Sequence, residues 1–186
     1  MDSEKKVVMV VPNYEFRDEE FSVPYEMLSD NGIGIKIAAA EPGECTGIGG
    51  TTIGVDLTFD EVNPDEFDGI VYVGGNGVER YFADDLALGL AQEFASTGKY
   101  VCAICWAPVV LAKAGILSGH NVAAWSGARE AIDEVGAKFS GNDVVTDGNI
   151  ITASSSEVAT DFARAIVDSL LFADVKTANE QPQEQL

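Results

Sequence analysis

The sequence predicts an α/β fold of three layers, in which an open, mainly parallel sheet is covered by helices on both faces. Short apolar segments rich in β-branched residues alternate along the chain with longer segments of helical periodicity. The strand segments are apolar throughout, as expected for strands that are buried on both faces. This pattern is typical of a flavodoxin-like sheet, and the 186 residues suit one domain. We expect that domain over residues 1–172, followed by a polar tail over residues 173–186 that we expect to be disordered.

The expected elements follow one another without a repeat or a linker. Many Gly and Thr residues with period-two patches between residues 41 and 60 indicate a short antiparallel excursion at the sheet edge. Asp147-Gly148-Asn149 joins two apolar runs, 144–146 and 150–152, in an expected hairpin, because Asp-Gly favours the positive φ of its turn. The other expected elements are strands at residues 6–11, 34–40, 69–73, 101–104 and 122–125, and helices at 18–31, 84–96, 107–114, 127–134 and 157–172.

The chain is strongly acidic, with 31 acidic and 11 basic side chains and a formal net charge of −20. The acids are spread along the chain rather than gathered in one tail. Such a field repels nucleic acid and anionic membranes, so we expect neither as a partner. We interpret the surplus as adaptation to high salt, which screens the self-repulsion. An ordinary acidic cytosolic protein and cation binding by the acids are the alternatives.

The N-terminus and the cysteines indicate a cytoplasmic protein. The segment MDSEKK lacks the apolar region of a signal peptide, and no apolar run has the roughly 18 residues of a membrane span. The three cysteines form no disulfide framework, which agrees with a reducing compartment.

The strongest functional signal is the segment Lys99–Gly115, whose apolar strand reaches Cys105 and turns at once into a helix. Pro108 suits the first turn of that helix, where its missing N–H costs nothing. A side chain at so sharp a corner projects beyond the carboxyl edge of the sheet, as at the nucleophile elbow of hydrolases. The positive end of the helix dipole favours a thiolate there. We therefore predict a reactive thiol at Cys105 that is ionised near neutral pH.

Two other loops should meet Cys105, because ligands of such sheets bind beyond the carboxyl ends of the strands. These are the loop after Val11 and the glycine turn after Val73. Cys102 is interpreted as a core residue, because its α-carbon lies about 10 Å from that of Cys105 along a strand, beyond the ~7 Å limit of a disulfide. No set of His or Cys ligands has metal spacing and no Walker lysine follows the glycines, so we expect no metal and no cofactor.

Three separated motifs resemble the ThiJ/PfpI superfamily, the family of the parkinsonism-linked protein "DJ-one". They are FRDEEFSVPYEML after the first strand, VGGNG before the Cys105 strand, and AICWAP at the corner. The resemblance extends from about Lys6 to Leu171 and includes DGNIITASSS. It implies the fold of class I glutamine amidotransferases.

The resemblance also implies roles for individual residues. Cys105 matches the elbow cysteine, and Glu20 matches its acidic partner, whose protonated carboxyl donates a hydrogen bond to the thiolate. The backbone N–H groups of Gly75 and Trp106 would form an oxyanion hole. A carboxyl beside a thiolate has a raised pKa; the alternative is that Glu20 is one more solvated acid of an acidic helix. The pocket expected around these residues is completed by Gly74, Asn76, Trp125 and Ser154.

The chain departs from the family pattern where a histidine is expected. One branch places that histidine directly after the cysteine, where this chain has Trp106, and another places it at the position of Trp125. An indole cannot accept a proton at neutral pH. The single histidine, His120, lies about 16 Å from Trp125 along an extended strand. We therefore expect no Cys–His dyad within the chain, which weakens protease-like hydrolysis. Ser154 replaces an arginine of some relatives, which removes an anion clamp.

Two functions remain open at this point. In the first, Cys105 attacks a small reactive carbonyl and Glu20 shuttles the proton, as the glyoxalase, deglycase and amidase-like hydrolase activities of the family imply. In the second, the protein is an oxidative-stress sensor or protective binding protein whose Cys105 is oxidised to sulfinic acid without turnover. An inert site is the third alternative. We expect a small-molecule substrate or oxidant as partner, and a homodimer, because relatives commonly form dimers or larger rings.

Overall fold

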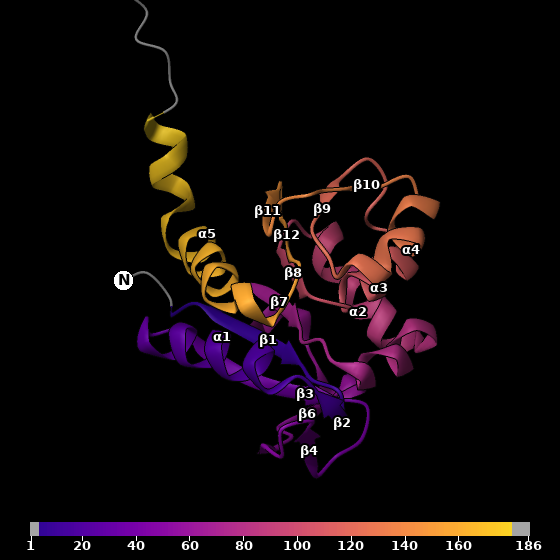
Figure 1. Cartoon of the computed structure of the whole chain (residues 1–186). Coiled ribbons are helices and arrows are strands. Elements are labelled where there is room, and N and C mark those ends of the chain that lie inside the picture. Colours follow the sequence, from indigo (N-terminus) through magenta and orange to yellow (C-terminus); the bar gives the residue numbers. More distant parts are fainter. Residues whose placement is uncertain (1–3, 180–186) are drawn as a thin grey trace, which may run out of the picture.

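The computed structural model describes residues 4–179, and the side chains of residues 4–172. Its centre is a sheet of seven strands, in which every neighbouring pair is parallel except the hairpin pair. The strands are β1 (Lys6–Val10), β3 (Gly34–Ala39), β6 (Leu57–Thr58), β7 (Gly69–Tyr72), β8 (Tyr100–Ile104), β11 (Val144–Asp147) and β12 (Ile150–Ala153). Their order across the sheet is β11-β12-β8-β7-β1-β3-β6 (Figure 1).

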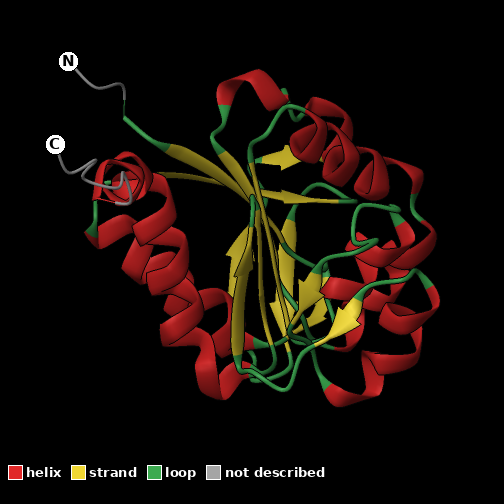
Figure 2. Cartoon of the chain, turned by 90° about the horizontal axis from the view of Figure 1, so that it is seen from above, coloured by secondary structure: helices red, strands yellow, loops and turns green. Residues whose placement is uncertain are grey.

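Helices cover both faces of this sheet (Figure 2), so the predicted three-layer architecture is confirmed. On one face lie α1 (Asp18–Asp30) and α5 (Ala159–Asn179), which contact each other. On the other face lie α2 (Asp85–Ser96), α3 (Pro108–Lys113) and α4 (Arg129–Glu134). Asp84 caps α2, because its carboxylate accepts hydrogen bonds from two backbone N–H groups of the first turn.

Each face of the sheet has its own apolar core, and the alternation of side chains along a strand divides the residues between them. In β1, Val7 and Met9 pack with Phe162 under α1 and α5. Val8 packs with Phe94 under α2. The strands read as continuous apolar runs because both of their faces are buried.

Two small sheets lie beside the main one. The excursion expected between residues 41 and 60 is the antiparallel pair β4 (Glu44–Gly47) and β5 (Thr52–Gly54), and β2 (Tyr14–Phe16) joins it. The other small sheet pairs β9 (Asn121–Val122) with β10 (Lys138–Phe139). Within residues 4–179 the remaining elements are five 3-10 helices, η1 (Phe59–Glu61), η2 (Pro64–Glu66), η3 (Asn76–Ala83), η4 (Ser126–Ala128) and η5 (Ser156–Val158).

Two expected boundaries were wrong. The strand expected at residues 122–125 ends at Val122, because the N–H of Ala123 donates to the hydroxyl of Thr152 (2.9 Å) instead of continuing a ladder. The last helix continues past Phe172 to Asn179, since no Gly or Pro stops it before Pro182. The rest of the expected tail, residues 180–186, lies outside the described residues. No described helix has the length and apolar character that crossing a membrane requires.

Candidate active site

Cys105 occupies the predicted corner between β8 and α3, in a backbone conformation that is costly for a side chain. Its φ is +64°, in the left-handed region that non-glycine residues seldom adopt. Hydrogen bonds on both sides hold this conformation, from Cys105 N–H to the carbonyl of Ala153 (2.8 Å) and from Trp125 N–H to the carbonyl of Cys105 (2.8 Å). The thiol is half-buried. The fold therefore maintains a strained corner that presents one sulfur at the sheet edge.

Glu20 lies in the first turn of α1 and is fully buried, with 1% of its surface exposed. Neither carboxylate oxygen has a hydrogen-bond partner among the described residues. The carboxylate packs against Gly74, where an added Cβ would collide with Oε2 of Glu20 and lie 3.1 Å from Cβ of Cys105. Gly74 thus leaves the space in which the acid and the cysteine come together, and Glu20 is not a solvated acid.

Burial raises the pKa of Glu20 to about 7. The Cys105 thiol, the Arg17 guanidinium and the Gly74 N–H act in the opposite direction, although neither the thiol nor the N–H meets full hydrogen-bond geometry. Near neutral pH this carboxyl therefore exchanges its proton readily, which is the property required of a general acid or base.

The pKa of the Cys105 thiol is shifted in the direction opposite to our expectation. Burial raises it to about 12, the ionised Glu20 adds to the increase, and the Trp106 N–H and Arg17 offset part of it. The dipole of the short helix α3 does not outweigh the loss of water around the sulfur. Because the two groups interact, they titrate as a pair, and the first proton leaves that pair near pH 7.

The thiol and the carboxyl border one cavity of about 290 Å³. It brings together residues from the loop before α1, the glycine turn after β7, the Cys105 corner, the loop after β9 and the loop after β12. The lining residues are Arg17, Glu20, Gly75, Asn76, Cys105, Trp106, Trp125, Ser155 and Ser156.

Two indole rings form one wall of this cavity. The centroids of the Trp106 and Trp125 rings lie 5.7 Å apart at an interplanar angle of 70°, and the Phe82 ring packs edge-on against Trp106 at 5.3 Å. Trp125 is 46% exposed. The Trp125 ring fits only because residue 127 is a glycine, since a Cβ at Gly127 would collide with the ring. The two positions where relatives are expected to carry a histidine therefore hold an edge-to-face aromatic pair.

Two backbone N–H groups at the cavity have no oxygen acceptor among the described residues, although that of Trp106 interacts with the Cys105 sulfur. These are the N–H groups of Gly75 and Trp106, which donate to no backbone or side-chain oxygen there. Gly75 has a φ of +107°, and a Cβ at this position would lie 2.5 Å from the backbone nitrogen of Arg17. A glycine is therefore needed for the close approach between this turn and the start of α1.

The serine predicted for the pocket is displaced by one position. Ser154 does not line the cavity, because its N–H donates to the Asp143 carbonyl (2.9 Å) and its hydroxyl to the Asp143 carboxylate (3.4 Å). Ser155 and Ser156 line it instead. Sequence reasoning also missed Arg17, whose only signal was its position at the start of the RDEE run. His120 is not a lining residue; its Nδ1 lies 3.6 Å from a carboxylate oxygen of Asp147.

The other cysteines lack such surroundings. Cys102 and Cys45 are free and fully buried. Burial raises the pKa of both thiols, that of Cys45 to about 11. Cys102 belongs to the core, as the strand spacing predicted. No cluster of three or more potential metal ligands occurs among the described residues.

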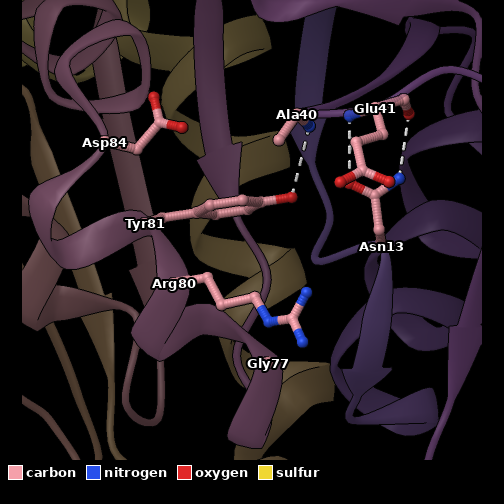
Figure 3. Close-up of a pocket in the computed structure, with 7 residues that line it drawn as sticks. All are labelled: Asn13, Ala40, Glu41, Gly77, Arg80, Tyr81 and Asp84. Carbon is pink, nitrogen blue, oxygen red and sulfur yellow. Dashed lines mark hydrogen bonds between the residues drawn. The ribbon is translucent and has the colours of Figure 1, made fainter.

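A second cavity, of about 170 Å³, lies beyond the ends of β1 and β3 (Figure 3). Asn13 exchanges two hydrogen bonds with the backbone of Glu41 (2.9 and 3.1 Å), and the Tyr81 hydroxyl donates to the Val11 carbonyl (2.9 Å). No thiol lines this cavity, so the nucleophilic chemistry of the chain belongs to the first one. Its lining residues are Asn13, Ala40, Glu41, Gly77, Arg80, Tyr81 and Asp84.

Comparison with known proteins gives a consistent result. A model of the DJ-1/PfpI family matches residues 5–169. The chain is 40% identical over 169 residues to an uncharacterized protein of Methanocaldococcus jannaschii, covering 89% of this chain and 82% of that protein. It is 38% identical over 148 residues to deglycase PfpI of Pyrococcus furiosus, covering 80% of this chain and 89% of that protein. A solved ThiJ/PfpI domain protein from Brachyspira murdochii superimposes with a TM-score of 0.88 and 32% identity, covering 90% and 97% of the two chains.

Proposed function

Because the chain belongs to the DJ-1/PfpI family, as three motifs predicted, we propose that it is an enzyme that acts on small reactive carbonyl compounds through Cys105. The relative from Pyrococcus furiosus is named a deglycase, which supports carbonyl chemistry. One observation carries the proposal. The thiol at the strained corner shares a cavity with a buried carboxyl that has no hydrogen-bond partner in the described chain and a pKa of about 7.

In the first step the Cys105 thiolate attacks the aldehyde carbon of a 2-oxoaldehyde. A C–S bond forms, and the C=O electron pair moves onto the oxygen, where the N–H groups of Gly75 and Trp106 stabilise the developing charge. Glu20 gives its proton to that oxygen, which yields a hemithioacetal. Because Glu20 is the stronger acid of the pair, its carboxylate takes the proton of the Cys105 thiol as the sulfur attacks and then passes that proton to the oxygen.

In the second step the Glu20 carboxylate removes the proton from the former aldehyde carbon and delivers it to the neighbouring carbon. The hydroxyl proton moves from the former aldehyde oxygen to the former ketone oxygen. The product is a thioester of a 2-hydroxy acid. Water hydrolyses this thioester, releasing the acid and restoring the thiol. The sum is the addition of one water to the 2-oxoaldehyde, with no external oxidant or reductant.

This route suits the cavity better than peptide hydrolysis does. An amine leaving group requires a proton donor on its own side, and histidine often has that task. Trp106 and Trp125 cannot donate and accept such a proton at neutral pH. Carbonyl addition and isomerisation have no leaving amine, so a single carboxyl can carry the proton.

The second candidate is an oxidative-stress sensor or protective binding protein whose Cys105 is oxidised to sulfinic acid without turnover. The observation that favours it is the unused hydrogen-bonding capacity of buried Glu20 beside the sulfur. A protonated Glu20 would donate to a sulfinate oxygen. In this case mild peroxide adds two oxygens to the protein at Cys105 only. Modification mainly at Cys45 or Cys102 would contradict this candidate.

The test of the enzyme proposal is the consumption of methylglyoxal by the parent and by Cys105→Ala. Cys102→Ala is the matched control, because it removes a thiol from the same strand but away from the cavity. We expect consumption to stop in Cys105→Ala and to persist in the control, with both variants folded by circular dichroism. Equal rates in Cys105→Ala and the parent would exclude the proposal.

The homodimer, the cytoplasmic location and the single-domain organisation expected from the sequence remain predictions. Light scattering on the purified protein tests the first of them, and a monomer over the working concentration range contradicts it.

A further inference from the structure

Arg17 is a cavity residue that the proposed mechanism does not use. It precedes α1 and is exposed, yet it borders the same cavity as Cys105. Its backbone is held in place, because its N–H donates to the Gly74 carbonyl (3.1 Å) and its carbonyl accepts from Glu20 N–H (3.1 Å). These bonds hold the backbone of Arg17 at the edge of the cavity.

Asp18, the acid next to Arg17 in the sequence, is hydrogen-bonded to a different part of the chain. The Asp18 carboxylate accepts hydrogen bonds from the backbone N–H groups of Gly49 (2.6 Å) and Thr51 (2.9 Å). The loop is built closely around this carboxylate, since an added Cβ at Gly47 or Gly49 would lie 2.7 or 3.0 Å from it. Asp18 is therefore held by this loop and forms no ion pair with Arg17.

No other acid pairs with Arg17 among the described side chains. Among the residues that line this cavity, Arg17 is the one basic side chain and Glu20 the one acid. Ser155, Ser156 and Asn76 line the same cavity, and their side chains carry hydrogen-bond donors. Together these groups can donate hydrogen bonds to one bound anion, and a guanidinium binds carboxylate and phosphate in a bidentate manner.

We propose that Arg17 makes the Cys105 cavity selective for reactive carbonyl compounds that carry an anionic group, a carboxylate or a phosphate. This inference rests on the proposed function for the carbonyl chemistry, and on Arg17 for the charge of the substrate. Arg17, which directly precedes α1, would thus supply the anion clamp that the sequence suggested was lost at Ser154.

The net charge of −20 opposes this selectivity only at long range. Repulsion between exposed charges is screened over about 8 Å at physiological ionic strength and over about 3 Å in molar salt. A contact between a guanidinium and a bound anion is shorter than either length. Salt therefore weakens the repulsion more than it weakens the contact.

The first experiment measures charge preference without any catalytic turnover. Iodoacetate and iodoacetamide alkylate the same thiolate, since the S–C bond forms as iodide leaves, and they differ in charge. The ratio of their rates at Cys105 therefore cancels any change in the thiol pKa. We expect Arg17→Gln to lower the iodoacetate-to-iodoacetamide ratio about fivefold, the upper range for an exposed ion pair. Arg164→Gln, which removes an equal charge from the surface of α5, should leave the ratio unchanged.

The second experiment uses aldehydes that can add to Cys105 but differ in charge. Glyoxylate carries a carboxylate and glycolaldehyde is neutral, and each is measured as an inhibitor of methylglyoxal consumption. We expect glyoxylate to inhibit at a lower concentration than glycolaldehyde in the parent, and this advantage to be lost in Arg17→Gln. Inorganic phosphate serves as a separate arm. Competition by phosphate but not by glyoxylate assigns the anionic group to phosphate, and the reverse assigns it to carboxylate.

The outcomes separate this inference from the proposed function. An alkylation ratio that is unchanged in Arg17→Gln, or lowered equally in Arg164→Gln, overturns the role of Arg17. A ratio lowered only in Arg17→Gln, with no inhibition preference for either anion, overturns the substrate class. If Cys105→Ala still consumes methylglyoxal, the enzyme proposal fails, while the alkylation ratio still reports on Arg17.

Discussion

Asp18 and Glu20 are two acids in the first turn of α1, and the tertiary structure gives them opposite properties. Asp18 accepts two backbone hydrogen bonds from the loop before β5. Although partial burial acts to raise its pKa, the hydrogen bonds of Thr51 and Gly49 lower it below the usual value. Glu20 is fully buried without a hydrogen-bond partner among the described residues, and burial raises its pKa to about 7. One acid stabilises the fold, whereas the other has a costly environment and lies beside the thiol.

The largest expected difference between the two acids is in turnover. Glu20→Gln removes the titrating proton while keeping the shape, so we expect kcat/KM for methylglyoxal to fall about 10³-fold, within the range of general acid–base catalysis. Asp18→Asn should change it far less, because Asp18 does not line the cavity. Equal losses in the two variants would show that the acids do not differ in function.

The second-largest expected difference between the two acids is in how the free energy of unfolding depends on pH. The folded pKa of Glu20 is about 7, above its ordinary value of 4.5, so the folded state binds the extra proton between these values. Its contribution to stability is fully present below pH 4.5 and is lost as the pH rises to about 7. We expect the free energy of unfolding of the parent, relative to Glu20→Gln, to fall by about 3 kcal/mol over this window.

Urea unfolding at several pH values measures this difference. Subtracting the variant from the parent at each pH removes the contribution of the other acids, which the two proteins share. A constant difference from pH 4.5 to 7 would contradict a raised pKa at Glu20.

The contribution of Asp18 to the free energy of unfolding should be smaller than that of Glu20, and its pH dependence should have the opposite sign. Asp18→Ala leaves the N–H groups of Gly49 and Thr51 without their acceptor, and we expect a loss of about 1 kcal/mol. That corresponds to a melting temperature lower by about 2–4 °C. Because its pKa is lowered, the contribution of Asp18 is present above its ordinary value of 3.8 and is lost as the pH falls below it. Glu19→Ala is the exposed control, for which we expect no change of melting temperature.

Salt should not distinguish the parent from Glu20→Gln. The net charge of −20 is spread over the surface, so molar KCl should raise the melting temperature of the parent if the acids reflect adaptation to salt. Glu20 is shielded from the solvent, so the variant should gain the same amount. A higher melting temperature in dilute buffer than in molar salt would exclude salt adaptation.

The sequence was sufficient for the order of the elements and for the corner at Cys105. Continuous apolar runs, an Asp-Gly turn and Pro108 are local signals, and the strands, the β11–β12 hairpin and α3 form where these signals lie. The strand expected up to Trp125 was wrong because its end depends on a hydrogen bond to Thr152, which is distant in sequence.

Site residues that depend on loop conformation were harder to predict. Three consecutive serines follow β12, and their types do not distinguish the one bonded to Asp143 from the two that border the cavity. Arg17 was missed for a similar reason. Its neighbour Asp18 is held by a loop about thirty residues away along the chain, a contact that the local sequence does not indicate.

By itself the sequence determined a parallel α/β sheet and a cysteine at the tight turn between one strand and the following helix. Both follow from hydrophobic periodicity and from residues that favour a turn locally. The family resemblance already indicated Glu20 as the acid beside that cysteine and a raised pKa for it, whereas only the tertiary structure decided that the pKa of the Cys105 thiol rises rather than falls. The physical reason is that burial and electrostatic interaction depend on groups brought together across the sheet edge, and their strength is set by distance in space and by the exclusion of water.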